Sequence, residues 1–323
     1  MTPKIFVTRP LPQPVMDLLK SNAEVRFNPE DAPMPVDKLA ESCRDVEGLL
    51  VVSNAVTNEL LGRATRLKVV STPSVGYDNI DVAACTRRRI AVTNTTGVLE
   101  ETTADLVFAT LLATARRLVE ADRFVREGRW KHWQFDLLYG VNVYQKTLGL
   151  IGFGNIGQAV ARRARGFAMR ILYSTRHRAP EPVERALEAT YVDRETLLRE
   201  SDFVSLHVPL TPETRHLIQA KDFSRMKPTA FLINTARGPV VDEESLVAAL
   251  KAKQIAGAGL DVFENEPRIH PELLSMDNVV LIPHLGSATA ETRLNMAMLA
   301  AQNLTEALAG RRPPNLINPE VYS

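Results

Sequence analysis

The sequence predicts an α/β protein built from two doubly wound parallel-sheet domains, and three observations support this. The 323 residues are enough for about two domains at roughly 150 residues each. Short apolar runs alternate with amphipathic stretches along most of the chain, as expected when strands and helices take turns. A glycine-rich turn, Gly152-Phe-Gly-Asn-Ile-Gly157, directly follows one of the apolar runs.

Composition excludes several classes of protein. With 39 Lys+Arg against 38 Asp+Glu the formal charge is +1, so the chain has no uniform field for nucleic acid or for an anionic membrane. Cys43 and Cys85 form no CxxC pair and no Cys/His cluster, which indicates a reducing compartment, core thiols and no metal site. Because no secretory leader and no apolar run of ~18 residues is present, we expect a cytoplasmic protein.

The first alternating series runs to about residue 98. Its apolar runs predict buried strands over 5–8, 48–52, 68–71 and 91–93. Between them, helical periodicity covers 15–20, 36–43 and 81–88. This alternation predicts a parallel sheet covered by helices on both faces.

Residues 100–127 break this rhythm and predict one long helix that is apolar over much of its circumference. Large side chains follow it in a non-repetitive stretch that includes Trp130, Trp133, Phe135 and Tyr139. These residues could pack against the chain's own domains, but we favour a subunit interface, because monomers seldom leave such a large apolar patch open.

A second series predicts strands over 148–151, 170–173, 203–206, 230–233, 256–260 and 279–282, with helices over 156–165, 194–199 and 243–251. This is a complete doubly wound domain by itself. The last helix, expected over 291–308, could pack on either domain.

The glycine-rich turn lies between an apolar strand and a helix, which is the context of a dinucleotide site. Gly152 would make the tight turn, Gly154 would let a pyrophosphate approach the backbone, and Gly157 would allow close packing of helix on strand. We therefore predict that a dinucleotide binds here.

Cofactor preference is expected at the end of the next strand. Ser174, Thr175 and Arg176 stand there, and the first acidic residue after that strand is Glu181. These residue types can bind a 2′-phosphate, so we predict NADP(H) in preference to NAD(H). The alternative is a solvated basic loop, because further arginines stand at 162, 163, 165 and 178.

Ionisable groups follow three later strands, at the edge where open parallel sheets bind ligands. Arg237 could bind a carboxylate, and Glu266 could stabilise an imidazolium. His284 and His207 both stand at strand ends and compete for the role of proton donor. Helix caps or ion pairs between domains could explain any one of these groups, but explain their joint occurrence less well.

The chain closely resembles the D-isomer-specific 2-hydroxyacid dehydrogenases over nearly its whole length. The motifs that carry the resemblance are Ser74-Val-Gly-Tyr-Asp-Asn-Ile-Asp81, the glycine turn, Asn234-Thr-Ala-Arg-Gly238, Leu260-Asp-Val-Phe-Glu-Asn-Glu-Pro267 and Pro283-His-Leu-Gly-Ser287. Within this family, Leu172-Tyr-Ser-Thr-Arg176 and the 130–140 stretch are most similar to glyoxylate/hydroxypyruvate reductases and bacterial 2-ketogluconate reductases.

The resemblance implies roles for individual residues. Arg237 would bind the substrate carboxylate and polarise the ketone, His284 would donate the proton, and Glu266 would tune His284, so His207 would belong to a loop on the cofactor side. Substrate would also be bound by Val75, Gly76 and Ser287. The implied cofactor residues are Thr103, Gly152, Gly154, Asn155, Ile156, Gly157, Ser174, Thr175, Arg176, Val208, Pro209, Thr214, Thr235, Asp261, His284 and Gly286.

The resemblance also implies the domain organisation. A flavodoxin-like substrate domain would comprise residues 1–98 and 290–323, with a Rossmann cofactor domain over 99–289 inserted in it and the substrate bound in the cleft between them. The helix and arm over about 100–145 would form a homodimer, and a partner's arm could complete the substrate pocket.

We therefore expect an NADPH-dependent reductase that converts glyoxylate, hydroxypyruvate or 2-ketogluconate to D-2-hydroxyacids. One alternative is a 3-phosphoglycerate dehydrogenase-like enzyme, disfavoured by the absence of a C-terminal regulatory domain and of an acid after Tyr173. Formate dehydrogenase is disfavoured because it has Gln where this chain has Glu266. A non-enzymatic, nucleotide-sensing corepressor would not need Arg237, Glu266 and His284 together.

Overall fold

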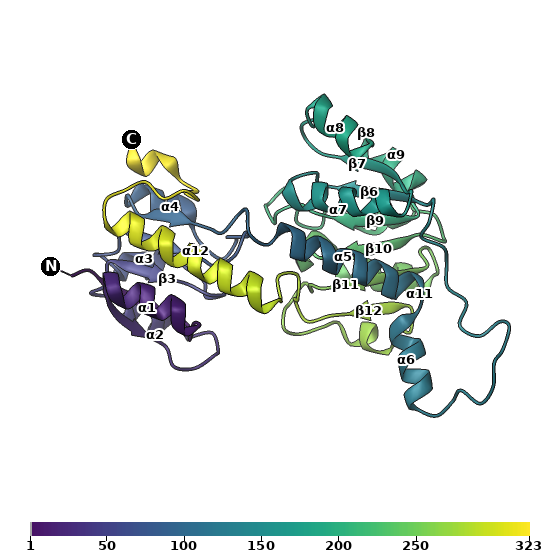
Figure 1. Ribbon diagram of the computed structural model, residues 1–323, viewed down its shortest axis with the longest axis horizontal. Coiled ribbons are helices and arrows are strands. Elements are labelled where there is room, and N and C mark those ends of the chain that lie inside the picture. Colours follow the sequence, from purple (N-terminus) through teal and green to yellow (C-terminus); the bar gives the residue numbers. More distant parts are fainter. Residues whose placement is uncertain (1) are drawn as a thin grey trace. The chain divides into compact units, whose positions relative to one another are not determined.

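The computed structural model describes residues 2–323, and its two parallel sheets with covering helices confirm the predicted α/β class (Figure 1). The chain divides into two compact units. The first contains the residues up to Leu99 together with Ser287–Ser323, and the second is Glu100–Gly286. Each sheet belongs to one unit.

The first unit holds a five-stranded parallel sheet in the order β2-β1-β3-β4-β5. Its strands are β1 (Lys4–Val7), β2 (Glu24–Phe27), β3 (Gly48–Leu50), β4 (Val69–Ser71) and β5 (Ala91–Thr93). The helices between them are α1 (Gln13–Asn22), α2 (Val36–Ser42), α3 (Asn58–Arg63) and α4 (Val82–Arg87). Strand β2 was not predicted, because it lies at the sheet edge and is mostly exposed, so it has no apolar run.

The last long helix, α12 (Ala290–Leu308), packs on this first sheet, against β3, β4 and β5 and beside α1. Its small side chains Ala297, Ala300 and Ala301 belong to the same buried cluster as Ile5 and Val69. The hydrophobic pattern alone left the partner of this helix open, and in the structure the helix packs on the first unit. The 3₁₀ turn η3 (Pro319–Tyr322) follows.

The second unit holds a seven-stranded parallel sheet in the order β12-β11-β10-β9-β6-β7-β8. Its strands are β6 (Thr147–Ile151), β7 (Arg170–Ser174), β8 (Ala189–Tyr191), β9 (Phe203–Leu206), β10 (Phe231–Asn234), β11 (Gly257–Leu260) and β12 (Val279–Leu281). Its helices are α5 (Glu100–Ala115), α6 (Leu118–Arg126), α7 (Asn155–Gly166), α8 (Glu181–Leu187), α9 (Arg194–Glu200), α10 (Ala220–Phe223) and α11 (Glu243–Lys251), with 3₁₀ turns η1 (Gly238–Val240) and η2 (Pro271–Ser275).

The prediction of one continuous helix over 100–127 is wrong. Helix α5 ends at Ala115, and Arg117 adopts a left-handed backbone conformation with φ 52° before α6 begins. Its guanidinium group then binds Glu120 in the first turn of α6, at 2.7 Å. Helix α5 packs against α7, β10 and β11, whereas α6 has no buried residue. The two helices therefore face different surroundings, and only α5 belongs to the core.

The segment after α6 carries the aromatic side chains that the sequence singled out, and they are exposed on this chain. Trp133 and Phe135 are 74% and 80% exposed, and Trp130 and Tyr139 are more than half exposed. Their rings pack edge to face: the centroid of the Phe135 ring lies 6.2 Å from that of Trp133 and 6.3 Å from that of Tyr139. We call residues 127–145 the arm.

Both cysteines are buried, as the composition predicted, and burial raises the pKa of Cys43 and of Cys85 to about 12. Across residues 2–323, no helix has the length and apolar character needed to span a membrane.

Candidate active site

The glycine turn between β6 and α7 has the geometry that a dinucleotide requires. Gly152 has φ +97°, and an added Cβ would lie 2.4 Å from the His207 carbonyl oxygen. An added Cβ at Gly157 would lie 2.6 Å from the Gly152 carbonyl oxygen, so α7 packs directly on the turn. Only glycine fits at these two positions.

The start of α7 is open on the side where a pyrophosphate would lie. Around Gly154 no described atom comes within 4 Å of an added Cβ. Asn155 and Ile156 form the first turn of the helix, and no side chain caps their amides. Free amide groups and the positive end of the helix dipole favour an anion at this point. The predicted cofactor residues of the turn therefore fit a dinucleotide.

The segment after β7 carries the residues predicted to select the cofactor. Ser174 and Thr175 are half-buried and Arg176 is exposed. The Thr175 hydroxyl donates to the His177 carbonyl oxygen at 2.6 Å, a local contact within the loop. The Thr211 hydroxyl lowers the pKa of Glu213, and the charge of Arg176 adds a smaller effect in the same direction.

The sequence grouped five arginines as a possible basic loop, and the structure corrects this grouping. Four of them are committed to carboxylates: Arg162 to Glu101, Arg163 to Glu101 and Asp105, Arg165 to Glu188, and Arg178 to Glu184. Of the five, Arg176 alone has no ion pair with a residue of the described chain. The cationic group left for a ligand is therefore a single side chain.

Three predicted cofactor residues from distant parts of the sequence meet beyond β11. Buried Asp261 accepts hydrogen bonds from the amides of Leu285, at 2.6 Å, and Gly286, at 2.9 Å. An added Cβ at Gly286 would lie 3.5 Å from a Thr103 methyl carbon. Burial raises the pKa of Asp261, although the two amides act to lower it.

Thr235, at the end of β10, has a buried hydroxyl with no hydrogen-bond partner among residues 2–323. A buried unsatisfied hydroxyl is unfavourable unless a ligand or water reaches it. Together with the open start of α7, this orphaned group fits a bound cofactor.

The remaining predicted cofactor residues follow β9. The side chain of Val208 would lie 3.1 Å from a Cβ added at Gly152, so it adjoins the glycine turn. The Thr214 hydroxyl donates to the Pro209 carbonyl oxygen at 2.6 Å and accepts from the Thr211 amide at 2.8 Å. In this structure Thr214 therefore holds the shape of the loop.

Arg237 lies on a rigid turn after β10. The Asn234 side chain accepts from the Ala236 amide at 3.1 Å and donates to the Arg237 carbonyl oxygen at 3.0 Å. Arg237 itself donates to the Ala236 carbonyl oxygen at 2.8 Å.

Gly238 brings this turn against the segment that follows β11. An added Cβ would lie 1.9 Å from the carbonyl carbon and oxygen of Phe263 and 2.5 Å from the Glu264 amide. Only a residue without a side chain allows the two backbones to approach so closely. The consequence is that Arg237 is held beside the segment that carries Glu266.

His284 and Glu266 form the central pair of the site. His284 Nδ1 lies 2.9 Å from Glu266 Oε2, and the other carboxylate oxygen accepts from the Phe263 amide at 3.0 Å. Burial acts to raise the pKa of Glu266, but the hydrogen bond and charge of His284, with the charge of Arg237, lower it overall. Glu266 therefore remains a carboxylate at neutral pH and leaves Nε2 of His284 for chemistry.

The backbone of His284 is in the left-handed region, with φ 54°, which is unusual for a residue with a side chain. Its amide donates to the Asp261 carbonyl oxygen at 2.9 Å. The end of β11 thus holds the His284 backbone in place, on the same strand end that supports Glu266.

His207, the second candidate for the proton donor, lies beneath the glycine turn. Its Nε2 is 2.9 Å from the Ser205 hydroxyl, and burial lowers its pKa to about 3. A ring that stays neutral at pH 7 and is turned toward the core is a poor proton donor.

The predicted substrate residues Val75, Gly76 and Ser287 belong to the first unit. The Val75 carbonyl oxygen accepts from the Asn94 side chain at 2.9 Å, and the Gly76 carbonyl oxygen accepts from the Ser74 hydroxyl at 2.5 Å. These contacts give the turn a defined shape.

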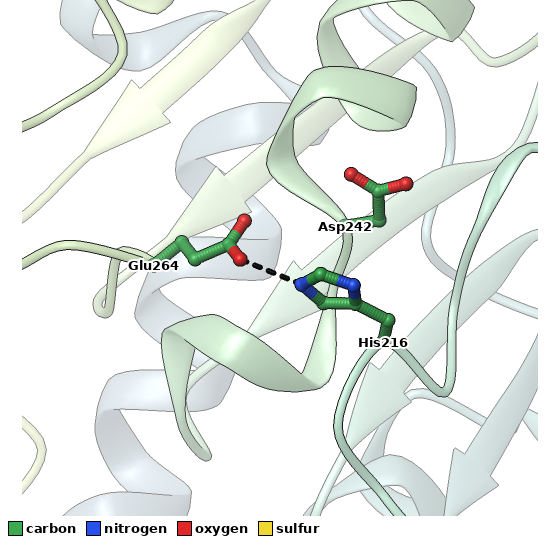
Figure 2. A group of neighbouring side chains, drawn as sticks. All are labelled: His216, Asp242 and Glu264. Carbon is green, nitrogen blue, oxygen red and sulfur yellow. Dashed lines mark hydrogen bonds and ion pairs between the residues drawn. The ribbon is translucent and has the colours of Figure 1, made fainter.

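One group of side chains that the sequence did not single out combines metal-ligand types: His216, Asp242 and Glu264. In Figure 2 a dashed line joins the His216 ring to the Glu264 carboxylate, and Asp242 is drawn nearby. Glu264 accepts from His216 Nε2 at 2.6 Å and from the Glu243 amide at 3.2 Å. Both Asp242 oxygens accept from Ser245, whose helix Asp242 caps. All four carboxylate oxygens thus have protein partners without an ion.

This group instead ties the segment after β11 to its neighbours. Glu264 also donates its amide to the Glu243 side chain, at 3.1 Å, so the link to α11 is reciprocal. Glu264 stands two residues before Glu266 and directly follows Phe263, the residue that Gly238 contacts. His216 and Glu264 are visible in the sequence as residue types that form hydrogen bonds, but no local pattern indicates that they pair with each other.

The chain is similar to known proteins over its whole length. Residues 108–286 match the family model "D-isomer specific 2-hydroxyacid dehydrogenase, NAD binding domain". The chain is 51% identical over 328 residues to a glyoxylate reductase of Thermococcus litoralis, covering 100% of this chain and 99% of that protein.

Solved structures are similar as well. A protein from Thermus thermophilus is 44% identical, with a TM-score of 0.91 over 97% of this chain and 99% of that one. The NADPH-dependent glyoxylate/hydroxypyruvate reductase of Sinorhizobium meliloti, in complex with NADP and malonate, is 35% identical, with a TM-score of 0.90 over 99% and 98% of the two chains. This chain therefore belongs to the D-isomer specific 2-hydroxyacid dehydrogenase family.

Proposed function

We propose that the protein reduces small 2-ketoacids, such as glyoxylate, hydroxypyruvate and 2-ketogluconate, to D-2-hydroxyacids with NADPH as the preferred cofactor. The observation that carries the proposal is the 2.9 Å contact between His284 Nδ1 and Glu266 Oε2, beside Arg237 and in the unit that holds the glycine turn. The similarity to the glyoxylate reductase of Thermococcus litoralis supports it.

Each of the three side chains has one task. Arg237 binds the substrate carboxylate with a bidentate pair of N–H donors and places positive charge near the keto oxygen. His284 Nε2 donates a proton to that oxygen as the carbonyl is reduced, and Glu266 stabilises the protonated ring and holds its orientation through Nδ1. For the first unit, the prediction remains that Val75, Gly76 and Ser287 bind the substrate.

A bound nicotinamide cofactor supplies the hydride that reduces the keto carbon. The turn Gly152–Gly157 and the first turn of α7 would hold its pyrophosphate. Thr103, Asp261 and Gly286 would lie at the nicotinamide end, with the orphaned Thr235 hydroxyl beside them. Val208, Pro209 and Thr214 would line the opposite side.

The preference for NADPH is supported by Arg176 and by the lack of an acid at the end of β7. A carboxylate at that position would accept both ribose hydroxyls and repel a 2′-phosphate. Ser174, Thr175 and Arg176 offer donors and a positive charge instead. The Sinorhizobium relative is described as NADPH-dependent and was solved with NADP.

A homodimer formed through α5, α6 and the arm is part of the proposal. The arm exposes Trp133 and Phe135, which is unfavourable for an isolated chain. A cavity of about 480 Å³ beside the arm is lined by apolar side chains such as Val119, Tyr139 and Leu274 together with charged ones such as Arg117 and Asp277, and it offers a site for side chains of a second copy. Light scattering would give the mass of one chain if this part of the proposal is wrong.

The test is NADPH oxidation followed at 340 nm with glyoxylate, hydroxypyruvate and 2-ketogluconate, repeated with NADH. We expect His284→Ala to lower kcat by about 10²- to 10⁴-fold, and Arg237→Ala to lower kcat/KM by about 10²- to 10³-fold. Arg199→Ala, at an exposed position on α9, is the control and should retain activity. Folded His284→Ala and Arg237→Ala variants with wild-type rates would overturn the proposal.

A further inference from the structure

The loop that is proposed to contact the 2′-phosphate has a support built from residues outside it. Tyr173 is the residue before the last of β7, and its side chain is fully buried. Its hydroxyl accepts from the Ala179 amide at 3.0 Å and donates to Glu184 in α8. Tyr173 precedes the loop 174–179, and its hydroxyl binds the last residue of that loop. The same hydroxyl links the loop to α8.

Glu184 is the centre of this support. Its side chain is only 8% exposed, which is unusual for a carboxylate. Besides the Tyr173 hydroxyl, it accepts two hydrogen bonds from Arg178, at 2.9 Å from Nε and 2.8 Å from Nη2. These contacts with Arg178 and Tyr173 hold the pKa of Glu184 near 2, so it remains charged at any pH where the protein works.

The same support extends to the glycine turn and to β8. The Ser174 carbonyl oxygen accepts from the Gly152 amide at 3.0 Å, and the Phe153 ring stacks on Tyr173 with centroids 4.1 Å apart. On the other side, the Tyr191 hydroxyl donates to the Thr175 carbonyl oxygen at 3.3 Å. In Figure 1, α8, β7 and β8 lie together at one edge of the larger sheet.

This arrangement gives the two arginines of the loop different surroundings. Glu184 neutralises Arg178, so Arg178 is drawn back toward α8, while Arg176 keeps its charge on the exposed part of the loop. A shape held before binding lowers the entropy cost of ordering the loop around a ligand.

We propose that Glu184 is a positioning residue that determines cofactor specificity: by holding Tyr173, Arg178 and the Ala179 amide, it presents Ser174, Thr175 and Arg176 to the 2′-phosphate of NADPH. NADPH differs from NADH only in its 2′-phosphate. A residue that positions the loop for this phosphate therefore contributes to the binding of NADPH and not of NADH. The inference rests on the proposed NADPH preference.

The experiment measures the ratio of kcat/KM with NADPH to kcat/KM with NADH. In Glu184→Gln we expect the ratio to fall about tenfold, the effect of losing one hydrogen-bonded charge interaction, through a rise in KM for NADPH with little change in kcat. Tyr173→Phe, which keeps the buried ring, should lower the ratio in the same direction by a smaller factor. A merely structural loss would lower both rates and leave the ratio unchanged.

Glu181→Gln is the matched control, because Glu181 lies on the same helix with its side chain 70% exposed, and among residues 2–323 its ion pair is with Arg185 alone. It should keep the wild-type ratio. If Glu184→Gln keeps the ratio within about twofold, or raises it because the released Arg178 binds the phosphate itself, the inference is wrong. Should Glu184→Gln not fold, the Tyr173→Phe ratio decides in the same way.

Wild type and Arg176→Ala separate this inference from the proposed function. If wild type shows no preference for NADPH, the proposed cofactor preference itself fails. If wild type prefers NADPH and Arg176→Ala loses that preference while Glu184→Gln keeps it, only the role of Glu184 fails.

Discussion

Replacing Gly238 with alanine tests whether the close approach of two backbones positions the proposed catalytic groups Arg237 and Glu266. The added Cβ would lie 1.9 Å from Phe263, and side-chain carbons essentially never come closer than 3.0 Å to a neighbour. The turn that carries Arg237 must therefore move by about 1.1 Å or more away from the segment that carries Glu266. A misplacement of about 1 Å costs on the order of 10²-fold in rate.

We accordingly expect Gly238→Ala to lower kcat/KM for glyoxylate with NADPH by about 10²-fold, and the free energy of unfolding by about 1–3 kcal/mol because of overpacking. Steady-state kinetics well below the melting temperature separates the two effects. Gly62→Ala is the control, because Gly62 lies within α3 and has no described atom within 4 Å of an added Cβ. Alanine there should stabilise the helix by about 1 kcal/mol or less.

A folded Gly238→Ala enzyme with wild-type kcat/KM would refute this reasoning. It would mean that the segment after β11 yields freely, and that the position of Arg237 relative to Glu266 does not depend on the contact.

Three further predictions concern stability and reactivity. The pKa of His207 falls from 6.5 in the unfolded chain to about 3 in the folded protein, so the unfolded chain binds an extra proton as the pH drops. Between pH 7 and pH 5 the free energy of unfolding of the wild type should therefore fall by about 2 kcal/mol more than that of His207→Gln. Denaturant unfolding at both pH values measures this difference. The thiols of Cys43 and Cys85 are buried with raised pKa, so a disulfide reagent should label them only after unfolding, and rapid labelling of the native protein would contradict their core positions. Because both carboxylates beside His216 are satisfied by protein donors, dialysis against a chelator should leave the melting temperature unchanged, whereas Glu264→Ala should lower it.

The sequence predicted best where a strand is buried on both faces. Strands such as β9 and β10 are entirely buried, so they read as unbroken apolar runs. The glycine turn was also predictable, because its spacing follows from contacts made within a single strand–helix unit. Arg237, Glu266 and His284 each follow an apolar run that predicts a strand. They became candidates for the site because open parallel sheets bind ligands at the carboxyl ends of their strands.

Other features depend on contacts between distant residues and left no local pattern. The edge strand β8 is short and mostly exposed, so its alternation is weak. Arg117 ends α5 through its backbone conformation, although the sequence across it remains compatible with a helix. The pairing of Arg178 with Glu184 removed one arginine from the basic loop, and composition alone cannot distinguish a committed guanidinium from an available one.

The way α12 covers the first sheet has a consequence for how the chain is made. The apolar face formed by Ile5, Val7 and Val69 is completed by Ala300 and Leu304, which lie more than two hundred residues later. During synthesis this face therefore stays uncovered until α12 has been made. The second unit is continuous in sequence and can fold as soon as residue 286 has emerged from the ribosome. Synthesis and folding thus run in different orders, and the first part of the protein to be translated is the last to be finished.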